Sequence, residues 1–168
     1  MESPSARLFL ALWPAPGVRA GLQAWRDAWD WPRKATPVRT GQLHLTLHFI
    51  GDVARERVPA LAHALAVPVA PFALRFGHAA LWHHGVAVAE PCSAPARLLA
   101  LHGELGQVLL AHGLPLDPRP YRPHVTLARR AAPAIARAGP PLRWQVRSYA
   151  LMESRADGYV TLRRYGAI

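Results

Sequence analysis

Short apolar runs alternate with amphipathic stretches along the first half of the chain. The run Arg7–Trp13 is almost wholly apolar and is closed by prolines, which is typical of a buried strand. In Gly17–Trp29 the large apolar residues recur every three or four positions, and this spacing predicts an amphipathic helix. The same reasoning predicts strands at Leu43–Ile50 and Phe72–Leu81, with a helix at Asp52–Ala66 between them.

The second half of the chain repeats this order of elements. Its pattern predicts a short strand, a long helix, a strand, a weak helix and two further strands, at Val86–Ala89, Ala94–His112, His124–Ala128, Ala131–Ala138, Leu142–Glu153 and Tyr159–Tyr165. The repetition favours an internally duplicated α+β fold with a pseudo-twofold axis. We expect a single domain over residues 1–168, with approximate lobes at 1–84 and 85–168.

One short motif occurs once in each half. It reads His44-Leu45-Thr46-Leu47 in the first half and His124-Val125-Thr126-Leu127 in the second, 80 residues later. With nine His and five Thr in 168 residues, chance placement predicts fewer than one His-x-Thr pair. Because side chains alternate between the faces of a strand, the His and Thr of each copy share one polar face. The two copies therefore predict a shared site built from two imidazoles and two hydroxyls.

Two imidazoles in one cleft suit an in-line displacement at phosphorus. The reference pKa of His is about 6.5, so near neutral pH one ring can be neutral while the other is protonated. One His can then activate the nucleophile while the other protonates the leaving oxygen. Thr46 and Thr126 can each donate a hydrogen bond to a non-bridging phosphate oxygen. A lone His-x-Thr on a strand is usually structural, but two matched copies favour a phosphodiester site.

Basic and aromatic residues flank the second motif. Arg129 offers a planar fork for phosphate oxygens, although simple alternation puts it on the face opposite His124, so a bulge or a strand exit must turn it. A solvated charge at the strand end is the alternative for Arg129. The next residue, Arg130, is a further candidate for contact with the substrate. Tyr121 and Arg122 lead into the motif and are candidates for substrate contact, as a ring that stacks on a base or as another phosphate contact. The default role for this segment is to anchor a turn.

The first motif adds one further candidate, and the rest of the sequence adds no cofactor site. Alternation puts His48 on the face of the motif His and Thr, near the rim, and puts Phe49 on the core face. No Cys, His, Asp or Glu cluster has the spacing of metal ligands, and there is no glycine-rich phosphate loop. We therefore expect no metal and no cofactor.

Charge and composition narrow the partners and the compartment. A net charge of +10 suits a polyanion such as RNA, although all the basic residues except Lys34 are Arg, a bias that also follows from high-GC codon usage. No apolar run approaches the ~20 residues needed to span a bilayer, and the first residues lack the pattern of a secretory signal. The single cysteine, Cys92, excludes an intramolecular disulfide. We expect a cytoplasmic monomer without membrane contact.

The motifs and their flanks resemble the 2H phosphoesterase superfamily. Within it the chain is most similar to the RNA 2′,3′-cyclic phosphodiesterases, which were first called 2′-5′ RNA ligases. The resemblance covers nearly the whole chain and is carried by four segments, Arg7–Leu12, His44–Gly51, Arg122–Arg129 and Leu151–Arg155.

This resemblance implies both a fold and a reaction. The fold is bilobal, with two antiparallel sheets lining a basic central groove and helices on the outside. The reaction is metal-independent opening of a terminal 2′,3′-cyclic phosphate to a 2′-phosphate, with reverse 2′-5′ ligation left open. By the resemblance His44 is the proton donor, His124 is the proton acceptor, and Thr46, Thr126 and Arg129 hold the phosphate. A near-symmetric site also permits the two histidines to exchange roles.

Two alternatives to an RNA-end hydrolase remain open. The first is a relative that acts on small cyclic phosphates or on 2′-5′ linkages, and a comparison of substrates separates the two. The second is a non-catalytic RNA-binding module, which would bind RNA and leave a cyclic end untouched. The partner is accordingly an RNA end or a small cyclic nucleotide.

Overall fold

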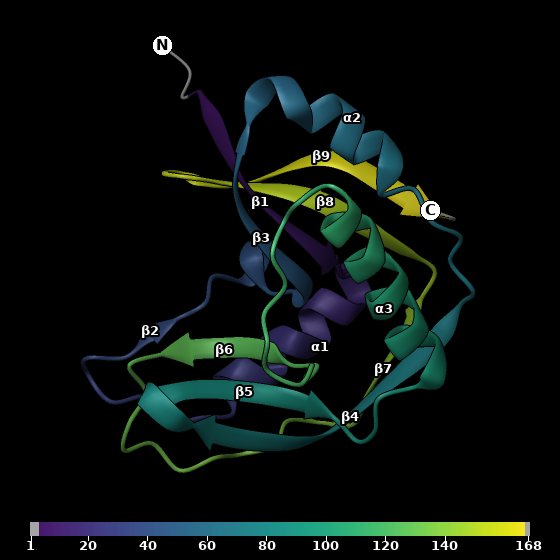
Figure 1. Cartoon of the computed structure of the whole chain (residues 1–168). Helices are drawn as coiled ribbons and strands as arrows, with labels where there is room; N and C mark the ends of the chain where they lie inside the picture. The colour runs from purple at the N-terminus through teal and green to yellow at the C-terminus, as the bar shows by residue number, and fades with distance from the viewer. Residues whose placement is uncertain (1–3, 167–168) are drawn as a thin grey trace.

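The structure, a computed structural model that describes residues 4–166, contains three α-helices, nine strands and three short 3₁₀ helices (Figure 1). The helices are α1 Pro16–Asp27, α2 Val58–Ala64 and α3 Ala96–Ala111, with 3₁₀ helices at Thr40–Gln42, Arg55–Arg57 and His83–Gly85. The strands are β1 Ser5–Leu12, β2 Thr36–Pro37, β3 Leu45–Ala54, β4 Phe72–Trp82, β5 Val86–Pro91, β6 Val125–Arg129, β7 Leu142–Val146, β8 Ser148–Arg155 and β9 Gly158–Gly166.

The strands form one curled sheet in the order β7-β4-β5-β6-β3-β1-β8-β9, with β2 paired to β6. The two motif strands, β3 and β6, are neighbours at its centre, yet they pair only at Leu45 and Val125. This narrow junction separates two groups of four strands, which we call the His44 lobe (β3, β1, β8, β9) and the His124 lobe (β6, β5, β4, β7). The predicted α+β class with antiparallel strands is confirmed, and the two expected sheets are joined edge to edge.

Each lobe takes strands from both halves of the chain. In the His44 lobe, β8 from the second half pairs with β1 and with β9. In the His124 lobe, β4 from the first half lies between β5 and β7. The expected lobe boundary between residues 84 and 85 is therefore wrong, because β1 and β5 find their outer hydrogen-bonding partners in the other half of the chain.

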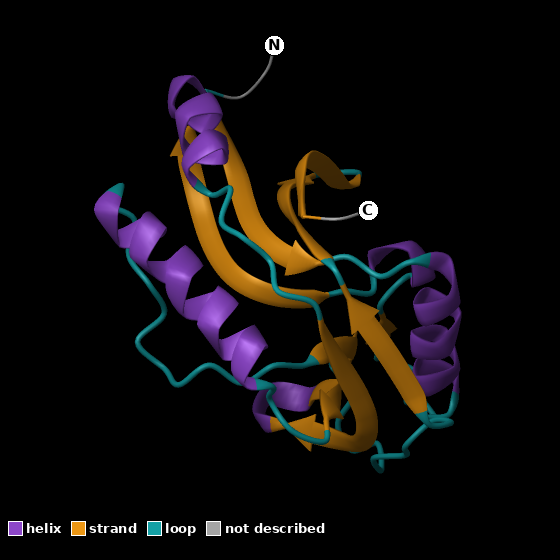
Figure 2. Ribbon diagram, turned by 90° about the vertical axis from the view of Figure 1, so that its right-hand side faces the viewer, coloured by secondary structure: helices purple, strands orange, loops and turns teal. Residues whose placement is uncertain are grey.

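The helices lie outside the curled strands, with α3 along one side and α1 along the other (Figure 2). Helix α1 buries Leu22 and Trp25 completely, as its apolar spacing predicts. The Trp25 indole N–H donates a hydrogen bond of 2.7 Å to the Pro140 carbonyl, which ties α1 to the segment before β7. Leu98 and Leu105 of α3 are also fully buried, and one core joins both lobes. No helix in the described part of the chain is long and apolar enough to cross a membrane.

The expected helix at Asp52–Ala66 begins later than predicted. Strand β3 continues past Gly51, because Asp52 and Val53 pair with β1. The α-helix starts only at Val58, after a short 3₁₀ turn. Cross-strand hydrogen bonds therefore override the helix-capping preference of Asp52.

Two expectations in the second half are also wrong. Residues 131–138 contain a turn but no helix, since Pro133 disfavours the helical conformation of the residue before it, Ala132. The expected strand Leu142–Glu153 is broken at Arg147 into β7 and β8. The break is required because β7 pairs with β4 in one lobe and β8 pairs with β1 in the other.

Candidate active site

A cleft of about 660 Å³ lies where the two motif strands meet, and both motif histidines and both motif threonines line it. His44 and Thr46 reach it from the start of β3, and His124 and Thr126 reach it from the start of β6. The two motifs, 80 residues apart in sequence, are thus brought to one site.

A β-bulge in β3 determines which neighbours of the first motif reach this cleft. Thr46 and His48 pair with adjacent residues of β1, so Leu47 is the extra residue of the bulge. A bulge resets the alternation of faces. Phe49 consequently lines the cleft and is 57% exposed, whereas His48 is 7% exposed and its Nε2–H donates to the His102 carbonyl at 2.7 Å. The expectations of a rim position for His48 and a core position for Phe49 are both wrong.

Strand β6 contains the matching irregularity. Thr126 and Ala128 pair with adjacent residues of β5, which leaves Leu127 as the extra residue. Arg129 is thereby turned onto the face of Thr126 and lines the cleft. Sequence reasoning required a bulge or a strand exit for Arg129, and the structure contains the bulge. The positions five residues after each motif His are therefore equivalent, with Phe49 on one side and Arg129 on the other.

Each motif histidine is held by the same kind of hydrogen bond. The Nδ1 of His44 lies 2.6 Å from the Gln42 carbonyl oxygen, and the Nδ1 of His124 lies 2.8 Å from the Arg122 carbonyl oxygen. A carbonyl only accepts, so each Nδ1 carries the proton and each neutral ring keeps the lone pair on Nε2. The Nε2 of His44 lies 3.1 Å from the Thr46 hydroxyl, which donates to it. Both rings are thus fixed in the tautomer that exchanges a proton at Nε2.

A tryptophan packs on each of the two imidazoles. Trp13 stacks on His44 at 5.5 Å between ring centroids, and Trp82 lies tilted on His124 at 4.3 Å. The Arg122 guanidinium covers Trp82 at 4.4 Å from the ring centroid, a favourable cation–π arrangement. These rings exclude water from one side of each histidine.

Burial lowers the pKa of both histidines. The pKa of His44 falls to about 4, chiefly because the buried ring loses hydration, and the positive charges of His124, Arg19 and Arg129 lower it further. The pKa of His124 is also lowered, first by burial, with Arg129 adding to the effect and Glu90 opposing it. Both rings are therefore mainly neutral near pH 7, and an incoming anion would favour their protonation.

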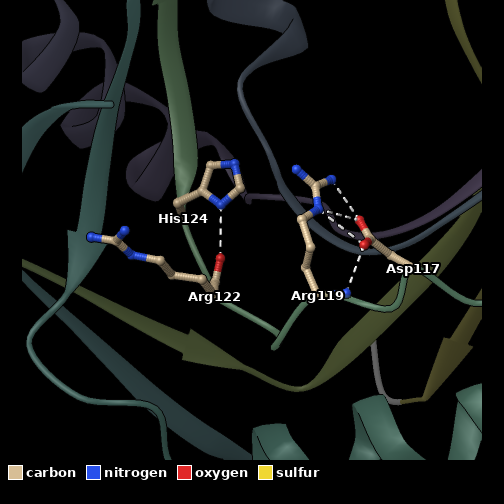
Figure 3. A network of polar contacts seen from close by, with 4 residues as sticks. All are labelled: Asp117, Arg119, Arg122 and His124. Carbon is tan, nitrogen blue, oxygen red and sulfur yellow. Dashed lines mark hydrogen bonds and ion pairs between the residues drawn. The ribbon is translucent and has the colours of Figure 1, made fainter. Parts of the chain in front are cut away.

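The mouth of the cleft is strongly basic. Arg7, Arg39, Arg119 and Arg129 all line it. Figure 3 shows Arg119 beside His124, with its guanidinium held by Asp117 at 2.6 Å. No group of three or more His, Cys, Asp or Glu in the part of the chain that the structure describes could hold a metal ion.

The residues that lead into the second motif have mainly supporting positions. The Tyr121 hydroxyl donates to the Thr46 carbonyl at 2.9 Å, so this side chain anchors its turn to β3, and burial raises its pKa. Arg122 forms an ion pair of 2.7 Å with Glu90, and both Tyr121 and Arg122 border a smaller cavity of about 420 Å³ next to the cleft. Arg130 does not line the cleft itself, but its guanidinium donates a hydrogen bond of 2.6 Å to the hydroxyl of Thr36, which does.

Several lining residues were missed by sequence reasoning, because they come from strands and loops far from the motifs. The only local signal is the polar Arg7 inside an apolar run, on β1. The others need the strand pairing to be known, since β1, β9 and the loop before β6 meet only in the folded chain. The missed lining residues are Arg7, Phe9, Arg39, Phe49, Arg119 and Tyr159, and Trp82 was missed as the ring that packs on His124 from the neighbouring cavity.

Comparison with known proteins gives consistent matches over most of the chain. The model of the 2′-5′ RNA ligase superfamily matches residues 13–158. The RNA 2′,3′-cyclic phosphodiesterase of Escherichia coli K12 is 32% identical over 91% of this chain and 86% of its own length. The enzyme of that name from Thermus thermophilus is 34% identical over 88% of this chain and 81% of its own length.

Solved structures match the fold as well as the sequence. The apo crystal structure of E. coli LigT superposes with a TM-score of 0.84 at 29% identity and covers 98% of each chain. A crystal structure described only as a phosphoesterase gives a TM-score of 0.86, also at 29% identity, over 96% of this chain and 98% of its own. With the two His-x-Thr motifs facing one cleft, these matches mean that the chain belongs to the 2′-5′ RNA ligase superfamily, the 2H phosphoesterases.

Proposed function

We propose that this enzyme, an RNA 2′,3′-cyclic phosphodiesterase, opens the terminal cyclic phosphate of an RNA to a 2′-phosphate with two histidines and no metal ion. Its E. coli and T. thermophilus relatives carry that enzyme name, and a similar E. coli LigT structure is complexed with 3′-AMP. The observation that carries the proposal is the pair of imidazoles in one cleft, each fixed by an Nδ1 hydrogen bond.

The proposed reaction divides the two proton transfers between the two rings. The Nε2 of His124 takes a proton from water as the water oxygen bonds to phosphorus. The bond from phosphorus to the 3′ oxygen breaks, and protonated His44 gives its Nε2 proton to that oxygen. The products are a 2′-phosphate and a 3′-hydroxyl, and proton exchange with solvent resets the two rings. A bound anion raises the fraction of His44 that is protonated, which offsets the effect of burial.

The phosphate is held by neutral hydroxyls and one guanidinium. We assign Thr46, Thr126 and Arg129 to its non-bridging oxygens, where negative charge concentrates in the transition state. The Thr46 hydroxyl donates to the His44 Nε2, so turning that hydroxyl to the phosphate would free Nε2 for proton transfer. The same site would form a 2′-5′ linkage if the 5′-hydroxyl of a second RNA replaced water.

The experiment that tests this proposal is an incubation of an RNA with a 2′,3′-cyclic phosphate end in excess EDTA. We expect the rate to stay within about twofold of the rate without EDTA, because the two rings supply both proton transfers. Phosphorus NMR identifies the product, which we expect to be a 2′-phosphate. Activity that is lost in EDTA and regained with a divalent ion would contradict the metal-free mechanism, and a 3′-phosphate product would contradict the choice of leaving oxygen.

Parallel incubations separate the remaining substrate classes. A small cyclic nucleotide, a 2′-5′-linked dinucleotide and the cyclic-ended RNA are compared by kcat/KM. Preference for the RNA supports the proposal, whereas preference for either small substrate favours the alternative enzyme. RNA that binds with its cyclic end intact would favour a non-catalytic binding module.

The pH dependence should differ between the free enzyme and its substrate complex. The base must be neutral and the acid protonated, so kcat/KM should fall on both sides of an optimum. Because burial and nearby arginines lower the pKa of both rings, we expect this optimum on the acidic side of neutrality. The bound phosphate anion raises the apparent values, so the kcat profile should lie at higher pH. The apparent pKa values on the acidic and basic sides of the profile belong to His44 and His124 as a coupled pair and are not assigned to either ring alone. A flat single-turnover profile from about pH 5 to 9 would contradict proton transfer by these rings.

A further inference from the structure

Two arginines face each other across neighbouring strands of the His124 lobe. Arg75 of β4 pairs directly with Arg143 of β7, and both side chains are exposed. Like charges placed directly opposite in an antiparallel pair destabilise the sheet. Among the described residues, neither guanidinium has a carboxylate within ion-pair distance, and Arg143 contacts only the Gln145 side chain, at 3.4 Å. The two positive charges of Arg75 and Arg143 therefore repel each other across the strands without a neighbouring carboxylate among the described residues to offset them.

This pair lies on the same face of β4 as Trp82, which packs on His124. Phe76 is buried in the core, so its neighbour Arg75 lies on the opposite face. The register shift at Gly77 resets the alternation, and beyond it Leu81 packs on the core while Trp82 packs on His124 and lines the 420 Å³ cavity next to the cleft. Arg75 and Trp82 are therefore at two ends of one face, about 20 Å apart at the usual rise of a strand.

A cavity of about 500 Å³ lies beside the two arginines. Both of them line it, together with Gly77 and Cys92, and its described lining contains no acidic residue. A Cβ at Gly77 would lie 2.8 Å from the Cys92 sulfur, so a glycine keeps the bulge compact here. The cavity thus offers two guanidinium forks to an anion, with no competing carboxylate in its walls.

We propose that Arg75 and Arg143 bind backbone phosphates of an RNA whose cyclic end occupies the catalytic cleft. Guanidinium forks match phosphate geometry, and contacts to the backbone are independent of sequence. A path of about 20 Å requires several nucleotides upstream of the reacting end, so a mononucleotide cannot reach the pair. This inference rests on the proposed function only in taking RNA as the substrate.

The test compares a long and a short ligand that carry the same phosphate end. The long ligand is a fluorescent RNA of about ten nucleotides with a 2′-phosphate, a length within the ~4–16 nucleotides that single-strand grooves cover. The short ligand is 2′-AMP. We expect Arg75→Ala/Arg143→Ala to weaken RNA binding about tenfold and to flatten the salt dependence by about 1.4 in log–log slope, the value for two phosphate contacts on a single strand. Affinity for 2′-AMP should not change.

A matched double variant controls for the loss of charge. Arg97→Ala/Arg163→Ala removes the same two charges from residues that line neither the cleft nor the 500 Å³ cavity. We expect it to weaken RNA binding less than twofold. Equal losses in both double variants, an equal loss for 2′-AMP, or no loss in the Arg75/Arg143 variant would each overturn the inference.

A single variant separates loss of binding from misfolding. Arg143→Glu replaces the like-charge pair with an opposite-charge pair across the same two strands, so its Tm should equal or exceed that of the parent. Its affinity for the RNA should nevertheless fall at least as far as that of the double alanine variant. Binding is measured by the fluorescence anisotropy of the labelled RNA, which requires no turnover. The proposed hydrolysis is tested separately, by assaying the parent protein with a cyclic mononucleotide, so failure of one proposal can be told from failure of the other.

Discussion

Replacing His44 or His124 with alanine is expected to lower kcat by about 10²–10⁴, which is the usual contribution of a positioned acid or base. Each ring is fixed through Nδ1 and presents Nε2 to the cleft, so its removal takes away one of the two proposed proton transfers. The effect should appear in single-turnover experiments, where chemistry itself is observed. The double variant should lose less than the product of the two single losses, because the two rings act as a unit.

Matched substitutions make this result specific. Thr46→Val and Thr126→Val remove one hydroxyl each and should cost less than the loss of either ring. His63→Ala removes an exposed imidazole of α2 and should leave kcat unchanged. Near-parental turnover by either the His44 or the His124 variant would contradict a two-histidine mechanism.

Sulfur in place of the bridging 3′ oxygen should restore activity to His44→Ala by nearly the full factor that the substitution removes. A thiolate is a far better leaving group than an alkoxide, since a thiol has a pKa of about 8.5, so its departure does not require an acid. His124→Ala should gain nothing from the sulfur substrate, because it lacks the base that activates water. The measurement is the ratio of single-turnover rates on the sulfur and oxygen substrates for each variant.

The same ratio also tests which ring has which role. If the sulfur substrate rescues His124→Ala and not His44→Ala, the donor and acceptor are reversed. If it rescues neither variant, the departing 3′ oxygen receives no proton from these rings and the acid–base proposal fails. The experiment is informative here because the cleft is nearly symmetric in its histidines and threonines, so geometry alone permits both orientations.

The sequence predicted the centre of the site well, because a repeated motif is a local signal. His44, Thr46, His124 and Thr126 were predicted to share one cleft, and all four line it. The strand and helix pattern also predicted the α+β class. In each case the information lies within a few consecutive residues, in the period of apolar positions or in the spacing of two polar ones.

Features that depend on distant parts of the chain were predicted poorly. The bulge at Leu47 arises in the pairing of β3 with β1, and alternation along β3 alone puts His48 and Phe49 on the wrong faces. The lobe boundary failed for a similar reason, since strand order is decided by contacts between distant strands. Trp82 reaches His124 only because β4 and β6 flank the same strand, β5.

The exchange of strands between the chain halves has a consequence for synthesis on the ribosome. Leu10 of β1 pairs with Leu151 of β8, about 140 residues later, so β1 is made long before its partner strand. At about 5–20 residues per second, β1 waits roughly 7–28 seconds for β8 to emerge. The His124 lobe needs no residue after Val146, so it can close first. During synthesis the strands around His124 can therefore pair before those around His44, and the site can become catalytically competent only after β8 has emerged.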